Sequence, residues 1–484
     1  MRRPPPPTRF PDRASFEALV AQGYNQVPVV QRLPLGMLRP VDLLRALPAG
    51  SRFLLESTRV SAEGRYSFLG ARPFLSFTAK EGQCFIDGER QPGPPLEVLR
   101  GLLRRWRGVR HPGMPLFCGG AVGFFGYEAA HCFEALPHHP RDDLRLPDIA
   151  LSFIDTFLVV DHHEGALLVV ATGSDWEDCE RRLGALEACV RSAGPTPRPA
   201  PPPADAPGAA YRSNFTQEAY LDAVERVREY IRAGDTYQVN LSQRLEVDFA
   251  GEPLALYEAL SAINPVHFAS YLEGDGFHVV SASPERLVRV EAGRATTRPI
   301  AGTRRRGTPE EEAHFVHELR TNEKERAEHA MLVDLERNDL GRVCTYGSVK
   351  VTKLMDIVEY AHVIHIESEV VGQLAPGVEP LDVVGALFPG GTITGVPKIR
   401  TMQIITELEP QARGLYTGSL GYLSFTGDLD LNIVIRTLVV KEGRAYAQVG
   451  GGIVHDSVAR QEYKETLNKA RSQLLALSAV RRMA

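Results

Sequence analysis

Residues 194–210, GPTPRPAPPPADAPGAA, constrain the fold more than any other stretch of this sequence. Proline lacks a backbone N–H, and a run of Pro and Ala without an apolar period stays extended and solvated, so we predict a surface connector here. The connector separates an N-terminal region, residues 1–193, from a C-terminal region, residues 211–484. With 484 residues the chain exceeds the usual size of a single core. We therefore expect two units or one large interleaved domain.

The patterns on the two sides of the connector indicate the fold class. Before it, short β-like runs such as RYSFLGARPFLSFTA alternate with glycine and aspartate turns. After it, NFTQEAYLDAVERVREYIRAGD has apolar residues at helical spacing and stops at a glycine, and residues 308–341 form a long charged helix. Strand-like runs and a closing helix follow, with no regular strand–helix–strand alternation and no repeat. This order predicts an α+β fold with substantial antiparallel sheet.

Composition excludes several classes of partner. A formal net charge of −5 gives no general attraction to nucleic acid or to an anionic membrane. The chain contains no uninterrupted run of about 18 apolar residues, so we expect no membrane span and a cytoplasmic protein. The six cysteines have no CxxC spacing, which favours reduced thiols. Cys118 is either a nucleophile or a small buried residue beside two glycines, and we favour the second interpretation because no base can be assigned to it.

Paired carboxylates are the first candidates for chemistry. Glu325 and Glu328 are spaced i, i+3 in one predicted helix, and Glu462 and Glu465 have the same spacing in another. Each pair lies on one helix face, so two converging helices would place four carboxylates around a hard dication such as Mg²⁺. Two solvated helix faces are the alternative, and the spacing alone does not decide between them.

Glycine-rich segments accompany these helices. GGGIVHDS lies directly upstream of the second pair, and FPGGTITGVPKIR stands between the two helices. Bare glycine amides, with donors from Thr392, Thr394 and Lys398, would cradle a small carboxylate or a phosphate. The segment is not a P-loop, because no glycine precedes the lysine and no Ser or Thr follows it.

Two further features have alternative interpretations. The alternation in HVIHIES favours a strand, which would point His362 and His365 to opposite faces and argues against a chelating pair. A structural histidine and a functional base remain the alternatives. The basic run from Arg304 to Arg306 has no aromatic residues beside it, so we interpret it as a solvated loop rather than a nucleic-acid site.

The order of several segments identifies a family. The segments are SASPERLV, RPIAGTRRRG, EKERAEHAMLVDLERNDLG, YAHVIHI, FPGGTITGVPKIRTMQIITELEP, YTGSLGYLSF, IVIRT and GGGIVHDS. They resemble, in the same order, those of the chorismate-utilising enzymes, and in particular component I of anthranilate synthase and of its sister, aminodeoxychorismate synthase. The resemblance spans essentially the whole chain, including FLLES and GGAVGFFGYE. It implies large antiparallel β-sheets packed as a sandwich with helices on the outside.

The resemblance also implies a metal ion. By motif match, Glu328 and Glu465 bind Mg²⁺, with Glu325 and Glu462 nearby. A dication is required because the ring carboxylate of chorismate would otherwise be repelled by the acidic side chains.

Substrate contacts follow from the same match. Arg436 and Tyr416 match positions that hold the enolpyruvyl carboxylate, and an arginine fork suits a planar carboxylate. Glu285 matches the general acid that protonates the departing C4 hydroxyl, so we expect a raised pKa for it. His365 matches a residue that assists the later loss of pyruvate. The other implied contacts are Thr392, Gly450, Gly451, Gly452 and Lys469.

Two positions bear on which reaction follows. Relatives that add water resemble this chain but have a lysine base at Gln238, and an amide cannot deprotonate water, so Gln238 favours amination by ammonia. Many aminodeoxychorismate synthases resemble PIKGT where this chain has Ala301, and their lysine attacks C2 so that ammonia reaches C4. Ala301 offers no nucleophile, which leaves C2 to ammonia and favours anthranilate.

Other segments favour the sister enzyme. The segments that resemble aminodeoxychorismate synthases more closely are QVNLSQR with its Asn240, INPVHFASYL, FPGGTITG and LDLNIVIRTL. We give the mechanistic residue Ala301 the greater weight and keep 4-amino-4-deoxychorismate as the alternative product.

FLLES resembles part of the tryptophan feedback pocket of anthranilate synthases, through Glu56 and Ser57. The alternative is a buried strand that ends in a polar turn. Where the family has Pro-Tyr-Met to complete the pocket, this chain has His267, Phe268 and Ala269, which argues against feedback inhibition.

The chain has no G-x-C-x-G nucleophile turn. The resemblance therefore implies a separate glutamine amidotransferase subunit in a hetero-oligomer, and the isolated chain is expected to use free ammonia. The rival hypothesis is an inactive relative that serves as a binding subunit. The presence of Glu285, Arg436 and the acidic pairs argues against this rival.

Overall fold

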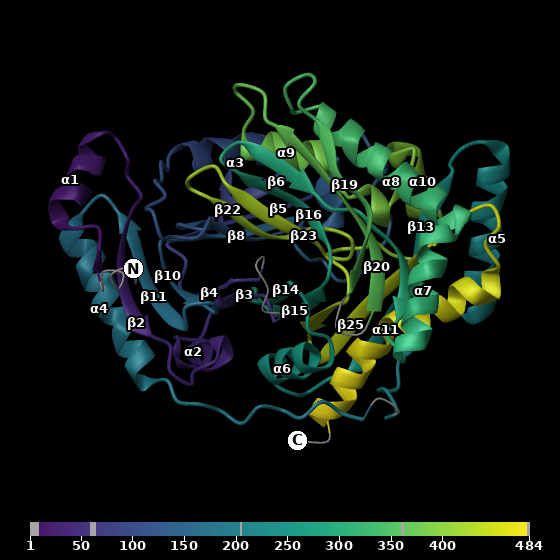
Figure 1. Cartoon of the computed structure of the whole chain (residues 1–484), viewed down its shortest axis with the longest axis horizontal. Helices are drawn as coiled ribbons and strands as arrows, with labels where there is room; N and C mark the ends of the chain where they lie inside the picture. Colours follow the sequence, from purple (N-terminus) through teal and green to yellow (C-terminus); the bar gives the residue numbers. More distant parts are fainter. Residues whose placement is uncertain (1–8, 59–63, 204–205, 360–362, 482–484) are drawn as a thin grey trace.

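A computed structural model of the chain describes residues 9–58, 64–203, 206–359 and 363–481, and it contains two large β-sheets (Figure 1). The larger, 13-stranded sheet runs β1 (Arg9–Phe10), β2 (Val27–Pro34), β11 (Ala166–Gly173), β10 (Thr156–Asp161), β4 (Tyr66–Gly70), β3 (Phe53–Glu56), β14 (Phe268–Glu273), β15 (Phe277–Ser283), β24 (Thr437–Lys441), β25 (Arg444–Ile453), β13 (Gln238–Asp248) and β12 (Arg212–Ser213). The short strand β21 (Gly395–Val396) also pairs with β13.

The second sheet has 12 strands. Its order is β18 (Ile300–Arg305), β20 (Val363–Gln373), β17 (Arg294–Thr297), β16 (Arg286–Glu291), β23 (Leu429–Ile433), β22 (Ser419–Ser424), β8 (Gly120–Phe125), β9 (Ile149–Ile154), β5 (Leu75–Lys80), β6 (Gln83–Ile86) and β7 (Glu89–Gln91), with β19 (Lys350–Glu359) paired to β20. Neighbouring strands in both sheets are antiparallel, as in the pairs β13–β25 and β22–β8.

Helices lie on the outer faces of the two sheets (Figure 1). They are α1 (Arg13–Ala21), α2 (Pro40–Ala46), α3 (Pro95–Arg104), α4 (Trp176–Ser192), α5 (Gln217–Ala233), α6 (Pro253–Ile263), α7 (Pro309–Thr321), α8 (Glu323–Gly341), α9 (Pro380–Leu387), α10 (Lys398–Leu408) and α11 (Ala459–Arg481), with 3₁₀ turns η1 (Tyr127–Cys132) and η2 (Gly391–Ile393). The predicted α+β sandwich of antiparallel sheets with outer helices is confirmed.

An apolar core lies between the sheets. Phe68 and Phe157 from the larger sheet contact Phe117 in this core, and Tyr422 from the smaller sheet contacts Phe117 and Phe68. Separate apolar clusters bind the helices to the outer faces, with α6 and α11 against the larger sheet. The order of layers is therefore helix, sheet, sheet, helix.

Strands from both sides of the connector share each sheet. In the larger sheet β3 lies between β4 and β14, and in the smaller sheet β8 pairs with β22. The described connector residues, 194–203 and 206–210, contain no helix or strand and run along the outside of the molecule (Figure 1). One attachment is visible in the contacts of Thr196, whose hydroxyl donates to Asp42 over 2.5 Å.

Local sequence signals explain the helix ends. Helix α5 begins where the Thr216 side chain accepts a hydrogen bond from the N–H of Ala219, and it ends at Gly234, whose φ of 84° is left-handed. The single long helix predicted over residues 308–341 is wrong, because it is divided into α7 and α8 at Asn322. Asn322 has extended backbone angles, and its side chain caps α8 by accepting from the N–H of Glu325 over 3.1 Å.

All six cysteines lie in the described part of the chain and are free thiols. Cys118 is fully buried, and burial raises the pKa of its thiol to about 12. A thiol with such a pKa is a poor nucleophile at neutral pH, which agrees with the interpretation of Cys118 as a packing residue.

Candidate active site

The predicted site residues come from several strands and two helices. Glu285 precedes β16, and its side-chain Oε1 accepts a hydrogen bond from the Thr392 hydroxyl of η2 over 2.9 Å. Burial raises the pKa of Glu285 to about 7, against the opposing effects of the Thr392 hydrogen bond and the charge of Lys469. Near neutral pH a large fraction of this carboxyl group therefore carries a proton that it can donate.

Strand β25 presents backbone groups to the same region. Ser242 and Asn240 of β13 lie opposite Gly450 and Gly452, respectively. Their N–H groups do not donate to β25: that of Ser242 donates to the Glu409 carboxylate, and that of Asn240 donates to the Thr394 carbonyl. Because the pairs of an antiparallel ladder alternate, Gly450 and Gly452 direct their own N–H and C=O groups away from β13. The pairing of β25 with β24 ends at Ala447, so beyond that residue this edge of β25 is open.

The glycines also leave room for polar side chains. A Cβ on Gly450 would lie 2.4 Å from Asn240 Oδ1 and 2.7 Å from the Tyr416 hydroxyl, and a Cβ on Gly452 would lie 2.5 Å from Gln238 Nε2. Within the described residues, Asn240 Oδ1 and Gln238 Oε1 are buried without a hydrogen-bond partner. Buried acceptors without partners are costly, so these two oxygens are suited to a donor from a bound molecule or water.

Arg436 and Tyr416 are near each other, as the substrate match requires. Burial lowers the pKa of Arg436, while the neighbouring Tyr416 and Glu465 raise it. Arg436 has a φ of 52°, an uncommon backbone conformation for a residue other than glycine. Lys469 of α11 reaches the same region and donates to the Gly450 carbonyl over 3.0 Å.

The four predicted metal-binding carboxylates lie on α8 and α11. Burial raises the pKa of Glu328, and the charges of Glu325 and Glu465 raise it further. Burial and the charge of Glu465 also raise the pKa of Glu462. The two helices therefore bring their carboxylates within electrostatic reach of each other.

Basic residues pair with two of these carboxylates. Arg304 lies 2.7 Å from Glu325 Oε1, and Lys469 lies 2.8 Å from Glu465 Oε1. In the described part of the chain, no three acidic, histidine or cysteine side chains are close enough to enclose a metal ion. The donors nevertheless fit Mg²⁺, which commonly takes one or two protein carboxylates and completes its shell with water and substrate oxygens. Glu325 Oε2 is moreover buried with no partner among the described residues.

Ala301 and His365 lie on neighbouring strands but on different faces. Ala301 pairs with Ile366 across β18 and β20, and cross-strand partners share a face, which here is the face covered by α8. Between Ala301 and the next pair, Gly302 forms a bulge with a φ of 61°, and a Cβ there would lie 2.9 Å from Glu325 Oε2. Gly302, the residue after Ala301, therefore lies beside the carboxylate of Glu325.

The surroundings of His365 favour its neutral imidazole form. Burial lowers its pKa to about 4, with a further lowering by the charge of Arg436 and an opposing hydrogen bond to the Gly302 backbone. The register places His365 opposite residue 303, on the face away from Ile366. His362, the other half of the predicted pair, lies outside the described residues.

Two of the donors predicted for the glycine-rich segment are engaged elsewhere. Lys398 forms an ion pair with Asp339 at 2.9 Å, and the Thr394 hydroxyl donates to the Gly390 carbonyl. Gly391 packs against α8, where a Cβ would lie 1.8 Å from Leu335 Cδ2. The prediction that Thr394 and Lys398 form an anion cradle is therefore wrong, and Thr392 alone of the three faces the acid Glu285.

The basic run also has internal partners. Arg304 pairs with Glu318 as well as Glu325, Arg305 with Glu311, and Arg306 with Glu312. Arg304 and Arg305 belong to strand β18, so the prediction of a solvated loop is wrong for these two residues, and their charges are paired with carboxylates of α7 and α8.

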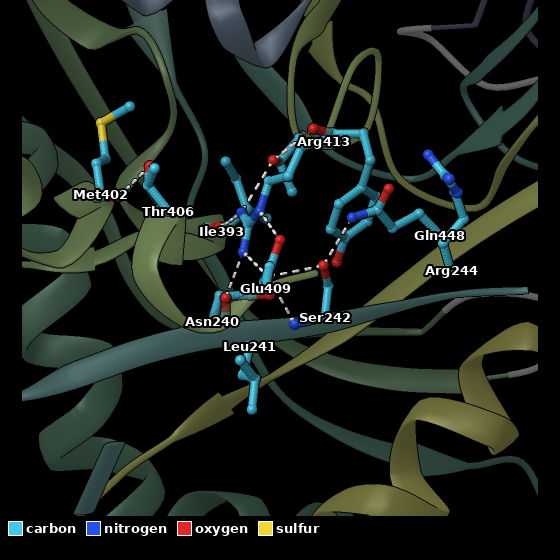
Figure 2. Close-up of polar contacts among 12 residues, drawn as sticks. Asn240, Leu241, Ser242, Arg244, Ile393, Met402, Thr406, Glu409, Arg413 and Gln448 are labelled. Atoms are coloured by element: carbon cyan, nitrogen blue, oxygen red, sulfur yellow. Dashed lines mark hydrogen bonds and ion pairs between the residues drawn. The ribbon is translucent and has the colours of Figure 1, made fainter. Parts of the chain in front are cut away.

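Sequence reasoning missed a buried ion pair beside the site. Arg413 and Glu409 are 1% and 2% exposed in their side chains, and Figure 2 shows the guanidinium of Arg413 among Asn240, Ile393 and Glu409. The available signal was the i, i+4 spacing of an acid and a base after α10. That spacing is common on solvated helices, so it does not indicate burial.

A cavity of about 380 Å³ lies between the sheets, lined by the residues that resemble the tryptophan pocket. Glu56 there accepts from the Tyr257 hydroxyl over 2.6 Å, and Ser57 lies 3.3 Å from His267 Nδ1. Arg286, the residue after Glu285, also lines the cavity, and its guanidinium lies 5.0 Å from the ring centre of Phe268. The cavity has the size of a small-molecule pocket.

Comparison with known proteins places this arrangement in a family. The sequence profile of the chorismate binding enzymes matches residues 50–475. The chain belongs to the chorismate-binding enzymes. This finding confirms the family to which the ordered motifs pointed.

Three relatives show how this chorismate-binding enzyme compares. It is 43% identical to anthranilate synthase component 1 of Thermus thermophilus over 93% of this chain and 95% of that protein. It is also 43% identical to aminodeoxychorismate synthase component 1 of Bacillus subtilis, over 88% and 91%. The crystal structure of anthranilate synthase component I from Streptococcus pneumoniae superposes with a TM-score of 0.78 at 34% identity, covering 92% of this chain and 99% of that one. Both sister groups are thus close relatives of this chorismate-binding enzyme.

None of its helices, over the residues described, is long and apolar enough to cross a bilayer.

Proposed function

We propose that this chorismate-binding enzyme converts chorismate and ammonia into anthranilate and pyruvate, in the cytoplasm, as the first component of an anthranilate synthase. The feature that supports this choice of product is Ala301, the residue before the Gly302 that lies beside Glu325, because its methyl group offers no nucleophile to C2 of the ring. With C2 unblocked, ammonia forms the new C–N bond there.

The residues of the chain have distinct tasks in this reaction. Arg436, Tyr416 and the outward amide of Gly452 bind the enolpyruvyl carboxylate, for which a guanidinium fork and N–H donors are suited. Glu285 donates its proton to the C4 hydroxyl, which leaves as water while nitrogen bonds to C2 and the ring double bonds shift. Gln238 accepts an N–H of the incoming ammonia and cannot activate water.

The second step removes the enolpyruvyl group as pyruvate. A proton leaves C2 of the ring and the C–O bond to the side chain breaks, which yields the aromatic amine. His365 is neutral at working pH, because burial lowers its pKa to about 4, so it is in the form that can accept a proton.

Mg²⁺ is part of this proposal. Glu328 and Glu465 would hold the ion, with Glu325 and Glu462 close by, and the bound ion supplies positive charge for the ring carboxylate of chorismate. Lys469, which now pairs with Glu465, would be released to donate to the substrate.

A glutamine amidotransferase subunit completes the proposed enzyme. The relatives named component 1 support a second component, and this chain itself has no glutaminase motif. The partner would hydrolyse glutamine and deliver unprotonated ammonia to the site, in a hetero-oligomer.

The second candidate is aminodeoxychorismate synthase, with 4-amino-4-deoxychorismate as product. Asn240 and the Bacillus subtilis relative support it. In this case ammonia reaches C4 without the lysine adduct, because Ala301 cannot form one.

The test is product identification. Purified chain, chorismate, MgCl₂ and ammonium chloride at alkaline pH are analysed by chromatography with mass detection, without added lyase and with Glu285→Gln as the inactive control. Anthranilate with equimolar pyruvate supports the proposal, and accumulated 4-amino-4-deoxychorismate contradicts it. With glutamine in place of ammonium the isolated chain is expected to give no product, and turnover would contradict the need for a partner.

The cavity beside Glu56 and Ser57 is proposed as an effector pocket of this enzyme. Its volume and its enclosed polar groups suit a small amino acid, and tryptophan is the first ligand to titrate. His267 and Ala269 replace residues of the usual pocket, so weak or no inhibition by tryptophan is the expected result.

A further inference from the structure

A single buried guanidinium joins the segments that carry the proposed substrate contacts. Arg413 donates from Nε and Nη2 to the two carboxylate oxygens of Glu409, over 2.9 and 2.7 Å. It also donates to the Asn240 carbonyl over 2.5 Å, to the Ile393 carbonyl over 3.2 Å and to the Thr417 hydroxyl over 3.1 Å (Figure 2). A guanidinium has five N–H groups, and these contacts use all of them.

Each partner of Arg413 belongs to a segment with a site residue. Asn240 lies on β13, two residues after Gln238. Ile393 follows Thr392, the donor to Glu285. Thr417 follows Tyr416. Asn240 is more than 150 residues before the other two partners, so the shared cation fixes the position of β13 relative to them.

The ring of Tyr416 is held by the same group. The guanidinium carbon of Arg413 lies 5.5 Å from the centre of the Tyr416 ring and 4.9 Å from that of Tyr127. A cation close to aromatic rings attracts both. The position of the Tyr416 hydroxyl, which faces Gly450, therefore depends on Arg413.

Space next to the ring makes this contact consequential. A cavity of about 20 Å³ is lined by Arg413, Tyr416 and Gln448. This cavity has room for about one water molecule, so the packing around the ring is incomplete on that side. Only a planar fork satisfies all five acceptors at once, because a lysine ammonium has three donors on one atom.

Glu409 fixes the cation in turn. Its Oε1 accepts from both the N–H and the hydroxyl of Ser242 on β13, over 2.9 and 2.8 Å. The carboxylate is thereby anchored to the strand whose Asn240 carbonyl Arg413 binds. The ion pair is therefore attached at two points to β13, the strand that pairs with the glycines of β25.

We propose that Arg413 and Glu409 are positioning residues for chorismate turnover, with Arg413 acting through Tyr416 on substrate binding and through Thr392 on the proton donor. The inference rests on the proposed function, because it assigns Tyr416 and Thr392 their tasks. Neither member of the pair contacts the substrate in this account.

The test is a double-mutant cycle. Arg413→Lys keeps the charge but loses the fork, and we expect it to raise the KM for chorismate about tenfold in the wild-type background. In a Tyr416→Phe background there is no hydroxyl to misplace, so the same change should raise KM less than about twofold. In a parallel cycle kcat is measured in a Thr392→Val background. Arg413→Lys should lower kcat less in that background than in the wild-type background. Arg413→Met, which also removes the charge, should raise KM and lower kcat more than Arg413→Lys does.

A matched control separates positioning from stability. Arg52 forms an ion pair with Glu273 at 2.6 Å, also largely buried, at the start of β3. Arg52→Lys should lower the melting temperature without changing KM or kcat at a temperature where both variants are fully folded. Full, multiplicative effects of Arg413→Lys in both backgrounds would overturn the inference and leave the proposed function standing. A wild-type chain that consumes no chorismate would overturn the proposed function and, with it, this assignment.

Discussion

At the scale of single residues, the proton on Glu285 connects structure with chemistry. The carboxyl group is removed from water between β16 and η2, and the Thr392 hydroxyl donates a hydrogen bond to it. Burial raises the pKa of Glu285 to about 7 from an ordinary value of 4.5. An acid with a pKa near the working pH is both protonated and able to release its proton.

The pH dependence of turnover should report this group. The protonated form is the active one, so kcat/KM for chorismate, measured at constant unprotonated ammonia, should fall as pH rises through about 7. Glu285→Gln should lower kcat by about a thousandfold and remove that fall. Steady-state rates over a pH series check this, and an unchanged profile in Glu285→Gln would contradict the assignment.

The substitution Glu285→Gln, which lowers activity, should raise the stability of the folded protein. A carboxyl with a raised pKa keeps its proton in the folded state while the unfolded state loses it, so its cost to folding is small near pH 4.5 and grows up to about pH 7. The free energy of unfolding of Glu285→Gln should therefore exceed that of wild type by roughly 3 kcal/mol near pH 8, and by less than about 1 kcal/mol near pH 5. Urea denaturation at the two pH values is the measurement.

The sequence singled out Glu285, Ala301 and the acidic pairs as candidates, because each is embedded in a run of residues that resembles a family motif. It did not indicate Arg413 and Glu409. Their burial arises from β13, η2 and the turn after α10 meeting around them, and those contacts span more than 150 residues of sequence. No local spacing contains that information.

At the scale of elements, strand β25 shows why alternation matters. Gly450 and Gly452 face side chains of β13 on one side, whereas Gly451 faces α11, with Glu462 Oε2 3.6 Å from where its Cβ would be. The resemblance implied substrate contacts from all three glycines without distinguishing between them. Pairing with β13 makes them different, because successive residues of a strand point to opposite faces.

This difference can be tested with two small substitutions. Gly450→Ala places a methyl group 2.4 Å from Asn240 Oδ1 and 2.7 Å from the Tyr416 hydroxyl, so one of them must move. The KM for chorismate should rise about tenfold. The Cβ of Gly451→Ala would come no closer than 3.6 Å to Glu462 Oε2, an ordinary contact, so its KM should stay within about twofold of wild type. Equal effects of the two variants would contradict the orientation of β25 described above.

Helices α8 and α11 carry the prediction for the metal ion. Chelation should abolish chorismate consumption, and Mg²⁺ should restore it. Glu328→Gln should raise the Mg²⁺ concentration for half-maximal activity at least about tenfold. Asp334→Asn, an exposed carboxylate on the same helix that pairs with Arg337, is the control and should leave that concentration unchanged. A normal Mg²⁺ requirement in Glu328→Gln would remove this residue from the ligand set.

At the scale of the whole molecule, each sheet is built from both sides of the connector. The connector itself was visible in the sequence, because proline-rich composition is a local property. The pairing of β3 with β14 was not, since its partners Leu54 and Tyr271 are more than 200 residues apart. Short apolar strands look alike whether they pair with a near or a distant partner.

The interleaving predicts the behaviour of a nicked chain. A protease site inserted between Pro201 and Pro202 should allow the connector to be cut while the two fragments stay together on size exclusion and keep the activity of the uncut protein. The two fragments can dissociate only if the strand pairs that they share in both sheets are broken. Fragments that elute separately in native buffer would show that the two regions are independent units.

Glu285 and Arg286 are joined by one peptide group, and their side chains point to different sites. One carries the proton beside Thr392, and the other lines the cavity between the sheets, where it pairs with Asp430 at 2.9 Å. We expect a molecule that displaces Arg286 on entering the cavity to shift the peptide group to which the acid is attached. By thermodynamic linkage the effect would be mutual, so chorismate would change the affinity of that molecule by the same factor. Ligand binding in the proposed effector pocket and proton donation by Glu285 would then be coupled through two adjacent residues.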